Sequence, residues 1–168
     1  MPVAITNSSY AIINQGSGFD RFFPDSLQNT GTGENKGVEL TLEKFFGKGY
    51  FFMLTGSLFD SKYTGNDGVK RNTDFNGNFA TNALFGYEKK IGKKQKNSFN
   101  VGFKSTWAGG KRYRTIDRAS SLAREEIVYI DSTRNTLQFQ NYFRLDAKFG
   151  IKFNGKKVGH EIALDLIN

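Results

Sequence analysis

The chain contains no cysteine, which excludes disulfide bonds, thiolate metal sites and cysteine nucleophiles together. It has one histidine, His160, which lies at the start of a predicted strand without a second histidine or a cysteine to share a metal. Gly16, Ser17 and Gly18 lack the spacing and the flanking elements of a nucleophile elbow. We therefore expect no enzyme, with no catalytic residues, no metal site and no cofactor.

Long hydrophobic runs are also missing. The longest uninterrupted apolar run is Tyr50 to Leu54 and the mean hydropathy is -0.51, so we expect no transmembrane helix. The first residues show no charged segment followed by an apolar one, so no signal peptide is visible; either the protein is cytoplasmic or its start lies elsewhere. A membrane β-barrel stays compatible, because its alternating strands leave a much weaker hydropathy signal.

Positive charge is in excess, with a formal net charge of +8. The lysines gather in two short segments, 89–96 and 152–157, which lie between strand-like runs and are typical of solvated turns. No recognition helix and no aromatic RNA-binding motif accompanies them. We therefore expect no nucleic-acid partner.

The clearest pattern is the alternation from Phe143 to Phe153, where apolar residues share one face and charged residues or glycine share the other. These eleven residues would run about 36 Å. A tilt near 45° projects that length onto about 25 Å, the height of the apolar band on a membrane β-barrel. The segment fits a membrane crossing, but the strand by itself favours a long amphipathic strand of a soluble antiparallel sheet.

Five further runs show strand signals. They are Val38 to Glu43, Tyr50 to Phe59, Phe79 to Lys89, Phe99 to Trp107 and His160 to Ile167. Gly47 to Gly49 forms a tight turn between the first two, and a short helix is predicted near Ser120 to Glu126. The polar stretch from Asp60 to Asn78 reads as a loop.

Short and long connections therefore alternate, as short periplasmic turns and long extracellular loops do in outer-membrane barrels. Aromatic residues gather at the tight turn (Phe45, Phe46, Tyr50 and Phe51), and Trp107 lies near the opposite end, as two interfacial girdles require. Each of these residues taken singly could equally belong to a core, and only their grouping favours a membrane. The predicted fold is all-β: an antiparallel meander of about six long strands, an incomplete segment of a large transmembrane β-barrel. Residues 1–35 would form an extracellular-type loop region and residues 36–168 the C-terminal barrel strands, with the terminal strand missing.

Several strings carry a resemblance to a known family. They are KGVELTLEKFF from Lys36, GYFFMLTGSLFDSKYTGNDGVKRNTDFNGNFATN through Asn82, GGKRYRTIDRAS from Gly109, NYFRLDAKFGIKFNGKK from Asn141 and HEIALDLIN from His160. In this order they resemble the C-terminal barrel of bacterial TonB-dependent outer-membrane receptors, of the group with an N-terminal carboxypeptidase-regulatory-like domain. The likeness spans nearly the whole chain.

The resemblance implies a barrel of about 22 strands in the outer membrane of a Gram-negative bacterium, with a plug domain in its lumen. It implies active uptake of a scarce ligand, an iron chelate, a cobalamin or a glycan, and three kinds of partner: outer-membrane lipid, the receptor's own plug and periplasmic TonB. The plug, the TonB-contacting segment and the signal peptide would lie outside this sequence. The alternative is a small soluble β-barrel or sandwich that binds a lipid or a sugar in a cleft.

Candidate contacts follow from the face and loop assignments. The charged face, with Lys104, Arg144, Asp146, Lys148 and Lys152, would face the plug or water. Aromatic rings and guanidinium groups supply stacking and bidentate contacts to anionic or ring-bearing ligands. The ligand-contact candidates in the loops are Trp107, Lys111, Arg112, Tyr113 and Arg118.

Overall fold

The computed structural model describes residues 1–6, 8–16, 26–93 and 95–168 of the chain. The chain divides into two compact units. The loop unit comprises residues 1–38, 58–78 and 109–141, and the sheet unit comprises residues 39–57, 79–108 and 142–168. Strands β3 (Thr32–Gly47) and β4 (Tyr50–Thr64) contribute residues to both units.

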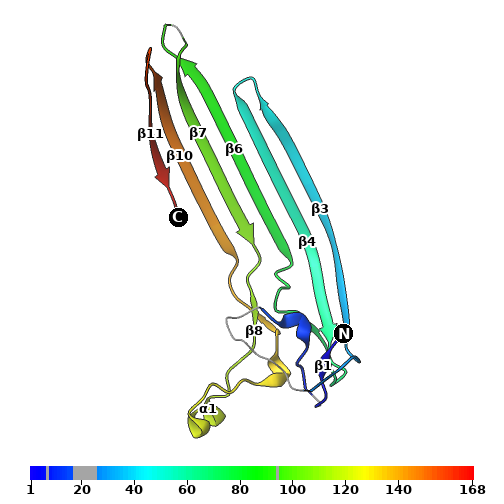
Figure 1. Ribbon diagram of the computed structural model, residues 1–168. Helices are drawn as coiled ribbons and strands as arrows, with labels where there is room; N and C mark the ends of the chain where they lie inside the picture. Colours follow the sequence, from blue (N-terminus) through cyan, green and yellow to red (C-terminus); the bar gives the residue numbers. More distant parts are fainter. Residues whose placement is uncertain (7, 17–25, 94) are drawn as a thin grey trace. The chain divides into compact units, whose positions relative to one another are not determined.

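An antiparallel meander of long strands forms the sheet, confirming the predicted fold class (Figure 1). The spatial order is β11, β10, β7, β6, β4, β3, and the short strand β5 pairs with β4. The remaining bounds are β5 (Lys70–Asn72), β6 (Phe79–Ile91), β7 (Asn97–Ala108), β10 (Tyr142–Asn154) and β11 (Gly159–Leu166). Consecutive long strands are neighbours, so the sheet stays open, with β3 and β11 at its two edges.

The expectation of a continuous loop from Asp60 to Asn78 was wrong. Strand β4 continues to Thr64, and β5 folds back onto it with Lys62 opposite Asn72 and Thr64 opposite Lys70. The turn between them contains Gly68 at a φ of 71°, in the left-handed region that favours glycine. Polar strand ends of this kind carry no hydrophobic alternation, so the sequence pattern could not reveal them.

A two-residue turn joins β3 to β4. Lys48 and Gly49 have φ values of 57° and 86°, and positive φ at both central residues defines the type I′ turn that suits a twisted hairpin. The Lys44 ammonium folds over this turn and donates to the carbonyl oxygens of Gly47 at 2.9 Å and Tyr50 at 3.0 Å. It also lies 3.7 Å from the centroid of the Tyr50 ring, so one side chain holds the turn closed.

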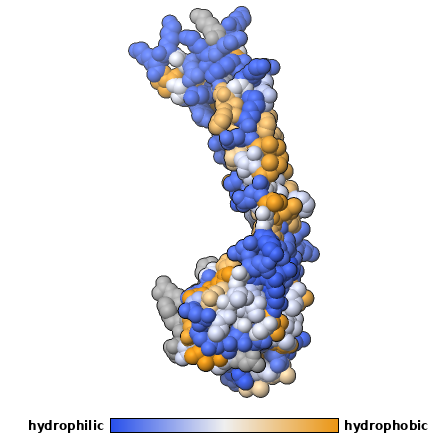
Figure 2. Space-filling model, turned by 90° about the vertical axis from the view of Figure 1, so that its right-hand side faces the viewer, coloured by the Kyte–Doolittle hydropathy of each residue, from blue (hydrophilic) through white to orange (hydrophobic). Residues whose placement is uncertain are grey.

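The strand registers confirm one continuous apolar face across β6, β7, β10 and β11. Phe85 lies opposite Phe103, which lies opposite Ala147, which in turn lies opposite Leu166. The next row consists of Tyr87, Val101, Phe149 and Leu164. Val101 and Ala147 are half-buried, and the other six residues are exposed, Leu164 by 59%. In Figure 2 hydrophobic residues collect along one side of the strand region.

The opposite face carries the charges and a pair of glycines. Lys148 lies 3.6 Å from Asp165 on the neighbouring strand, and Arg144 donates to both carboxylate oxygens of Asp146 at 2.9 Å. Gly86 and Gly102 lie opposite each other in the row of Lys148, and the Phe51 ring lies over Gly86. Phe51 therefore belongs to the polar face, and its assignment to a lipid-facing aromatic girdle was wrong.

The loop unit has a small buried core of its own. Val3, Ala11 and Tyr63 are buried, with Met1 and Ile13 packed against them. The segments that supply them include β1 (Val3–Ala4), which pairs with β2 (Leu27–Gln28), and the 3-10 helix η1 (Ile12–Asn14). Tyr63 is only 1% exposed, and its hydroxyl donates to the Ser9 carbonyl at 2.9 Å. Burial raises the pKa of Tyr63.

We expect Gly86→Ala to destabilise the sheet by about 1–3 kcal/mol, because the added Cβ would overlap the Phe51 ring. Gly102→Ala is the matched control, since the nearest atoms to its Cβ lie 3.8 Å away, and it should change stability by less than about 0.5 kcal/mol. Urea unfolding measures both changes. In a Phe51→Ala background the Gly86→Ala penalty should vanish, and a penalty that persists there would exclude ring packing as its cause.

Candidate ligand site in the loop unit

A narrow antiparallel ribbon builds the candidate site. Strand β8 (Arg112–Tyr113) pairs with β9 (Leu137–Gln138), and farther along Ile116 pairs with Tyr129. The tip carries helix α1 (Arg118–Arg124), and the return segment includes the 3-10 helix η2 (Asp131–Thr133). The ribbon brings residues from 111–116 next to residues from 129–139.

Asp117 caps the tip helix, as its position before the helix favours. Its carboxylate accepts from the Ser120 backbone amide at 3.0 Å and from the Ser120 hydroxyl at 2.7 Å. These hydrogen bonds lower the pKa of Asp117, because they favour its charged form. The predicted helix near Ser120 to Glu126 is therefore present, two residues earlier at each end.

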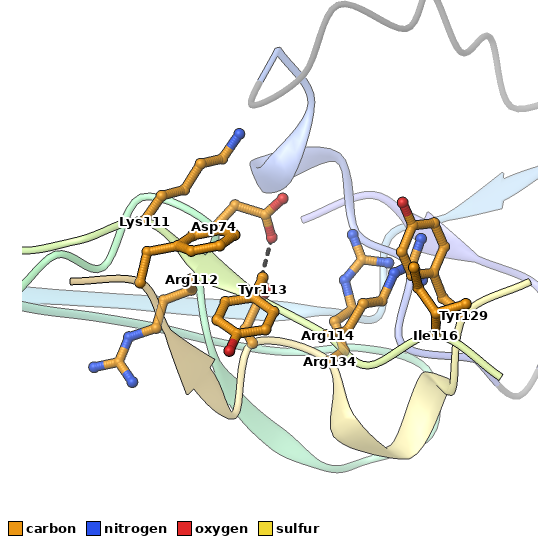
Figure 3. A pocket seen from close by; sticks show the side chains of 10 residues that line it. Asp74, Lys111, Arg112, Tyr113, Arg114, Ile116, Tyr129 and Arg134 are labelled. Atoms are coloured by element: carbon orange, nitrogen blue, oxygen red, sulfur yellow. Dashed lines mark hydrogen bonds between the residues drawn. The ribbon is translucent and has the colours of Figure 1, made fainter. Parts of the chain in front are cut away.

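A pocket of about 440 Å³ opens beside this ribbon. It combines basic side chains with aromatic rings (Figure 3). Its lining residues are Asp74, Lys111, Arg112, Tyr113, Arg114, Ile116, Tyr129, Arg134, Asn135 and Phe139. The volume lies in the range of small-molecule pockets, about 300–1,000 Å³.

Two arginines give the pocket its electrostatic character. The Arg114 guanidinium carbon lies 4.2 Å from the centroid of the Tyr129 ring, and a guanidinium nitrogen lies 3.8 Å from the Asp131 carboxylate. Burial lowers the pKa of Arg114, and the neighbouring charge of Arg134 lowers it further. In Arg134 the buried Nε has no hydrogen-bond partner among the described residues. Such a pair of guanidinium groups favours an anionic group between them.

An aromatic stack forms another part of the wall. The rings of Tyr113 and Phe139 lie 4.3 Å apart at an interplanar angle of 26°. These residues come from the two sides of the ribbon, so the β8–β9 pairing creates the stack. A stacked pair beside guanidinium groups suits a ligand that has a planar ring and a negative charge.

Hydrogen bonds from Asn135 hold part of the pocket lining in place. Asn135 is 3% exposed with a φ of 58°, and its amide nitrogen donates to the Asn72 carbonyl at 2.8 Å and to an Asp74 carboxylate oxygen at 2.6 Å. Figure 3 shows Asp74 within the pocket lining, with this hydrogen bond as a dashed line. Asn135 thereby connects the return segment of the ribbon to residues 72–74, at the end of β5.

The structure brings together three of the five candidate contacts from the sequence: Lys111, Arg112 and Tyr113 all line the pocket. The Arg112 guanidinium is engaged by the chain, since it donates to the Asn76 carbonyl at 3.0 Å and the Asn78 side chain at 2.6 Å. Trp107 belongs to the sheet unit and stacks edge-on against Phe79 at 4.9 Å. Arg118 begins α1 and does not line the pocket.

Sequence reasoning missed four of the lining residues that matter most: Arg114, Tyr129, Arg134 and Phe139. Arg114 could have been found, because it follows Arg112 by two residues in one extended string. The other three come from the return segment, whose pairing with β8 has no distinct sequence signal.

The site offers binding groups and little acid-base machinery. Within residues 1–6, 8–16, 26–93 and 95–168, no group of three or more histidine, cysteine, aspartate or glutamate residues is placed to hold a metal ion. No helix of the described chain is long and apolar enough to span a bilayer.

These features define a class. An open antiparallel sheet with one exposed apolar face and one charged face, short turns at one end and long connections at the other, is a segment of a transmembrane β-barrel wall. A comparison with protein families matches the family described as TonB dependent receptor-like, beta-barrel, over residues 4–168. The chain belongs to this family of outer-membrane receptors and transporters. Searches of curated proteins and of solved structures found no match.

We expect Asn135→Ala to loosen the pocket by about 1–3 kcal/mol, because it removes the hydrogen bonds that the Asn135 amide donates to the Asn72 carbonyl and to one Asp74 carboxylate oxygen. Hydrogen exchange of the backbone amides around Asp74 measures the local opening. Asn135→Ala also places an alanine at a positive φ, which is a second source of strain. Asn135→Gly separates the two effects, since glycine removes the hydrogen bonds but tolerates the positive φ. Wild-type protection in the glycine variant would show that the hydrogen bonds contribute nothing.

Proposed function

We propose that this chain forms part of the barrel wall and the outer loops of a TonB-dependent receptor in the outer membrane of a Gram-negative bacterium. The observation that carries this proposal is the family match over residues 4–168 together with the continuous apolar face of the sheet. Residues 1–35 belong to the outer loop region and residues 36–168 to the C-terminal barrel strands. The receptor takes up a scarce ligand actively and is not an enzyme.

The apolar face supports outer-membrane lipid as a partner. Its rows of Phe, Leu and Ile side chains are exposed over four neighbouring strands. Soluble monomers rarely expose contiguous apolar patches larger than a few hundred Å². Lipid acyl chains remove such a face from water without a second protein layer.

The polar face supports a plug domain as a partner. Arg144 pairs with Asp146 and Lys148 with Asp165, so this face carries balanced charges that suit a wet interface rather than a dry core. A plug in the lumen would be coupled to periplasmic TonB. The family implies these partners in general terms.

The loop-unit pocket supports an anionic, ring-bearing ligand. Arg114 and Arg134 provide positive charge, and the Tyr113–Phe139 stack provides a ring face. Of the three ligand classes expected from the sequence, an anionic iron chelate uses both features, whereas a neutral glycan would use only the aromatic stack. A cobalamin would contact the aromatic wall with its rings and the positive charge with its single phosphate group.

We expect Leu145→Arg to destabilise the receptor by about 1–3 kcal/mol, because it places a charge on the lipid face, two residues inside the row of Trp107. Lys148→Ala, three residues away on the polar face, should cost less than about 1 kcal/mol, the usual worth of an exposed ion pair. Folding into lipid vesicles, followed by urea titration, measures both. Equal costs for the two variants would contradict the assignment of the faces.

We expect the double variant Arg114→Gln and Arg134→Gln to reduce uptake of an anionic ferric chelate at least about tenfold, since charge-assisted hydrogen bonds contribute about 1.5–3 kcal/mol each. The assay compares uptake of labelled ferric chelates, cobalamin and a neutral oligosaccharide in cells that depend on the full-length receptor. Arg118→Gln is the matched control and should leave uptake unchanged. An effect of Arg118→Gln as large as that of the double variant would contradict the pocket.

A further inference from the structure

Most of the chain's excess positive charge lies at one end of the sheet. We define the basic turn end as residues 43–50, 88–93, 95–97 and 152–161, the described parts of the three short connections of the sheet unit with their flanking strand ends. These segments contain nine lysines and no arginine against three glutamates. They therefore supply six of the eight net positive charges.

Most of these lysines are available to a partner. Lys44 is occupied by the turn that it closes, and Lys90 lies beside Glu88 in an ion pair. The other described lysines of the basic turn end are exposed to solvent. They are Lys48, Lys89, Lys93, Lys96, Lys152, Lys156 and Lys157. Figure 2 shows hydrophilic residues crowding the end of the strand region that carries the turns.

The lysines lie where the apolar face ends. Lys89 belongs to the apolar face itself, opposite Phe99, in the row that continues through Ile151 and Ile162. A lysine at this place can lay its methylene chain along the apolar surface and direct its ammonium group to the membrane interface. Phe45, 79% exposed beside the first turn, marks the same boundary. The remaining lysines follow within a few residues, at the level of lipid headgroups.

We propose that the basic turn end binds the headgroups of anionic phospholipids in the leaflet that the short turns face. The proposal rests on the proposed function for its orientation, because short turns of outer-membrane barrels face the periplasm. A lipid surface fits better than an acidic protein, since the charges spread over three turns along the edge of the apolar face instead of forming one compact patch. Clusters of basic residues at a membrane surface attract anionic lipid in this way.

The test measures lipid selectivity of the full-length receptor. The receptor is reconstituted in phosphatidylcholine vesicles, and its association with spin-labelled phosphatidylglycerol is compared with that of spin-labelled phosphatidylcholine. The test variant carries Lys93→Gln, Lys156→Gln and Lys157→Gln. The control variant loses the same charge in the loop unit through Lys36→Gln, Lys62→Gln and Lys70→Gln.

We expect the wild-type receptor to prefer phosphatidylglycerol over phosphatidylcholine. At low salt, the ratio of its association with the two lipids should fall by about fivefold for each lysine that the test variant lacks. Salt at about 1 M should weaken the wild-type preference, because it shortens the screening length to about 3 Å. Replacing the same three lysines by arginine should retain the preference, since the charge remains.

Three outcomes would overturn the proposal: an unchanged preference in the test variant, an equal loss in the control variant, or a wild-type receptor without any preference. A test variant that keeps its lipid preference but binds isolated peptidoglycan less well would assign the lysines to the cell wall instead. Protease protection of the reconstituted receptor is measured first. A chain that fails to insert contradicts the proposed function, whereas an inserted receptor without lipid preference contradicts only this inference.

Discussion

The alternation of side chains in the long strands is the constraint on which the rest of the structure depends. Each strand must direct successive residues to opposite faces, and in this sheet the apolar set stays exposed. In a soluble sandwich the same rows, such as Tyr87, Val101, Phe149 and Leu164, would form the core. A face of this kind requires hydrocarbon around it, and hydrocarbon requires every strand to pair with a neighbour, because it offers no hydrogen-bond partners to the backbone.

The opposite face follows from the same constraint. Charges that are excluded from the lipid side gather there in pairs, Arg144 with Asp146 and Lys148 with Asp165. Gly86 of β6 and Gly102 of β7 lie opposite each other and have no side chains, and the Phe51 ring occupies the space above Gly86. The polar face thus has its own packing, and an aromatic residue there is no evidence of contact with lipid.

Alternation also explains what could be predicted from the sequence. All six long strands were found, because each has a hydrophobic period of two over many residues. Strand β5 was missed, since a polar three-residue strand leaves no periodic signal. Phe51 was grouped with the aromatic girdle because it lies beside the tight turn, whereas its ring covers Gly86 on the polar face. In the candidate site, Lys111 to Tyr113 form one local string, whereas Arg134 and Phe139 come from residues more than twenty positions away. The two-residue pairing of β8 with β9 and the isolated Ile116–Tyr129 bridge bring them together.

So short a ribbon cannot hold its shape through backbone pairing alone, because isolated two-stranded hairpins are marginal in water. Side chains supply the missing restraint: Arg112 bonds to the Asn76 and Asn78 segment, and Asn135 bonds to Asn72 and Asp74. This division of roles distinguishes the arginines of the loop unit. The Arg112 guanidinium is hydrogen-bonded to Asn76 and Asn78, in the segment after β5, so its removal would disturb the shape of the pocket. Arg114 and Arg134 instead place positive charge in the pocket wall. In the proposed site, affinity for an anion would therefore depend on Arg114 and Arg134, and the shape of the pocket would depend on Arg112.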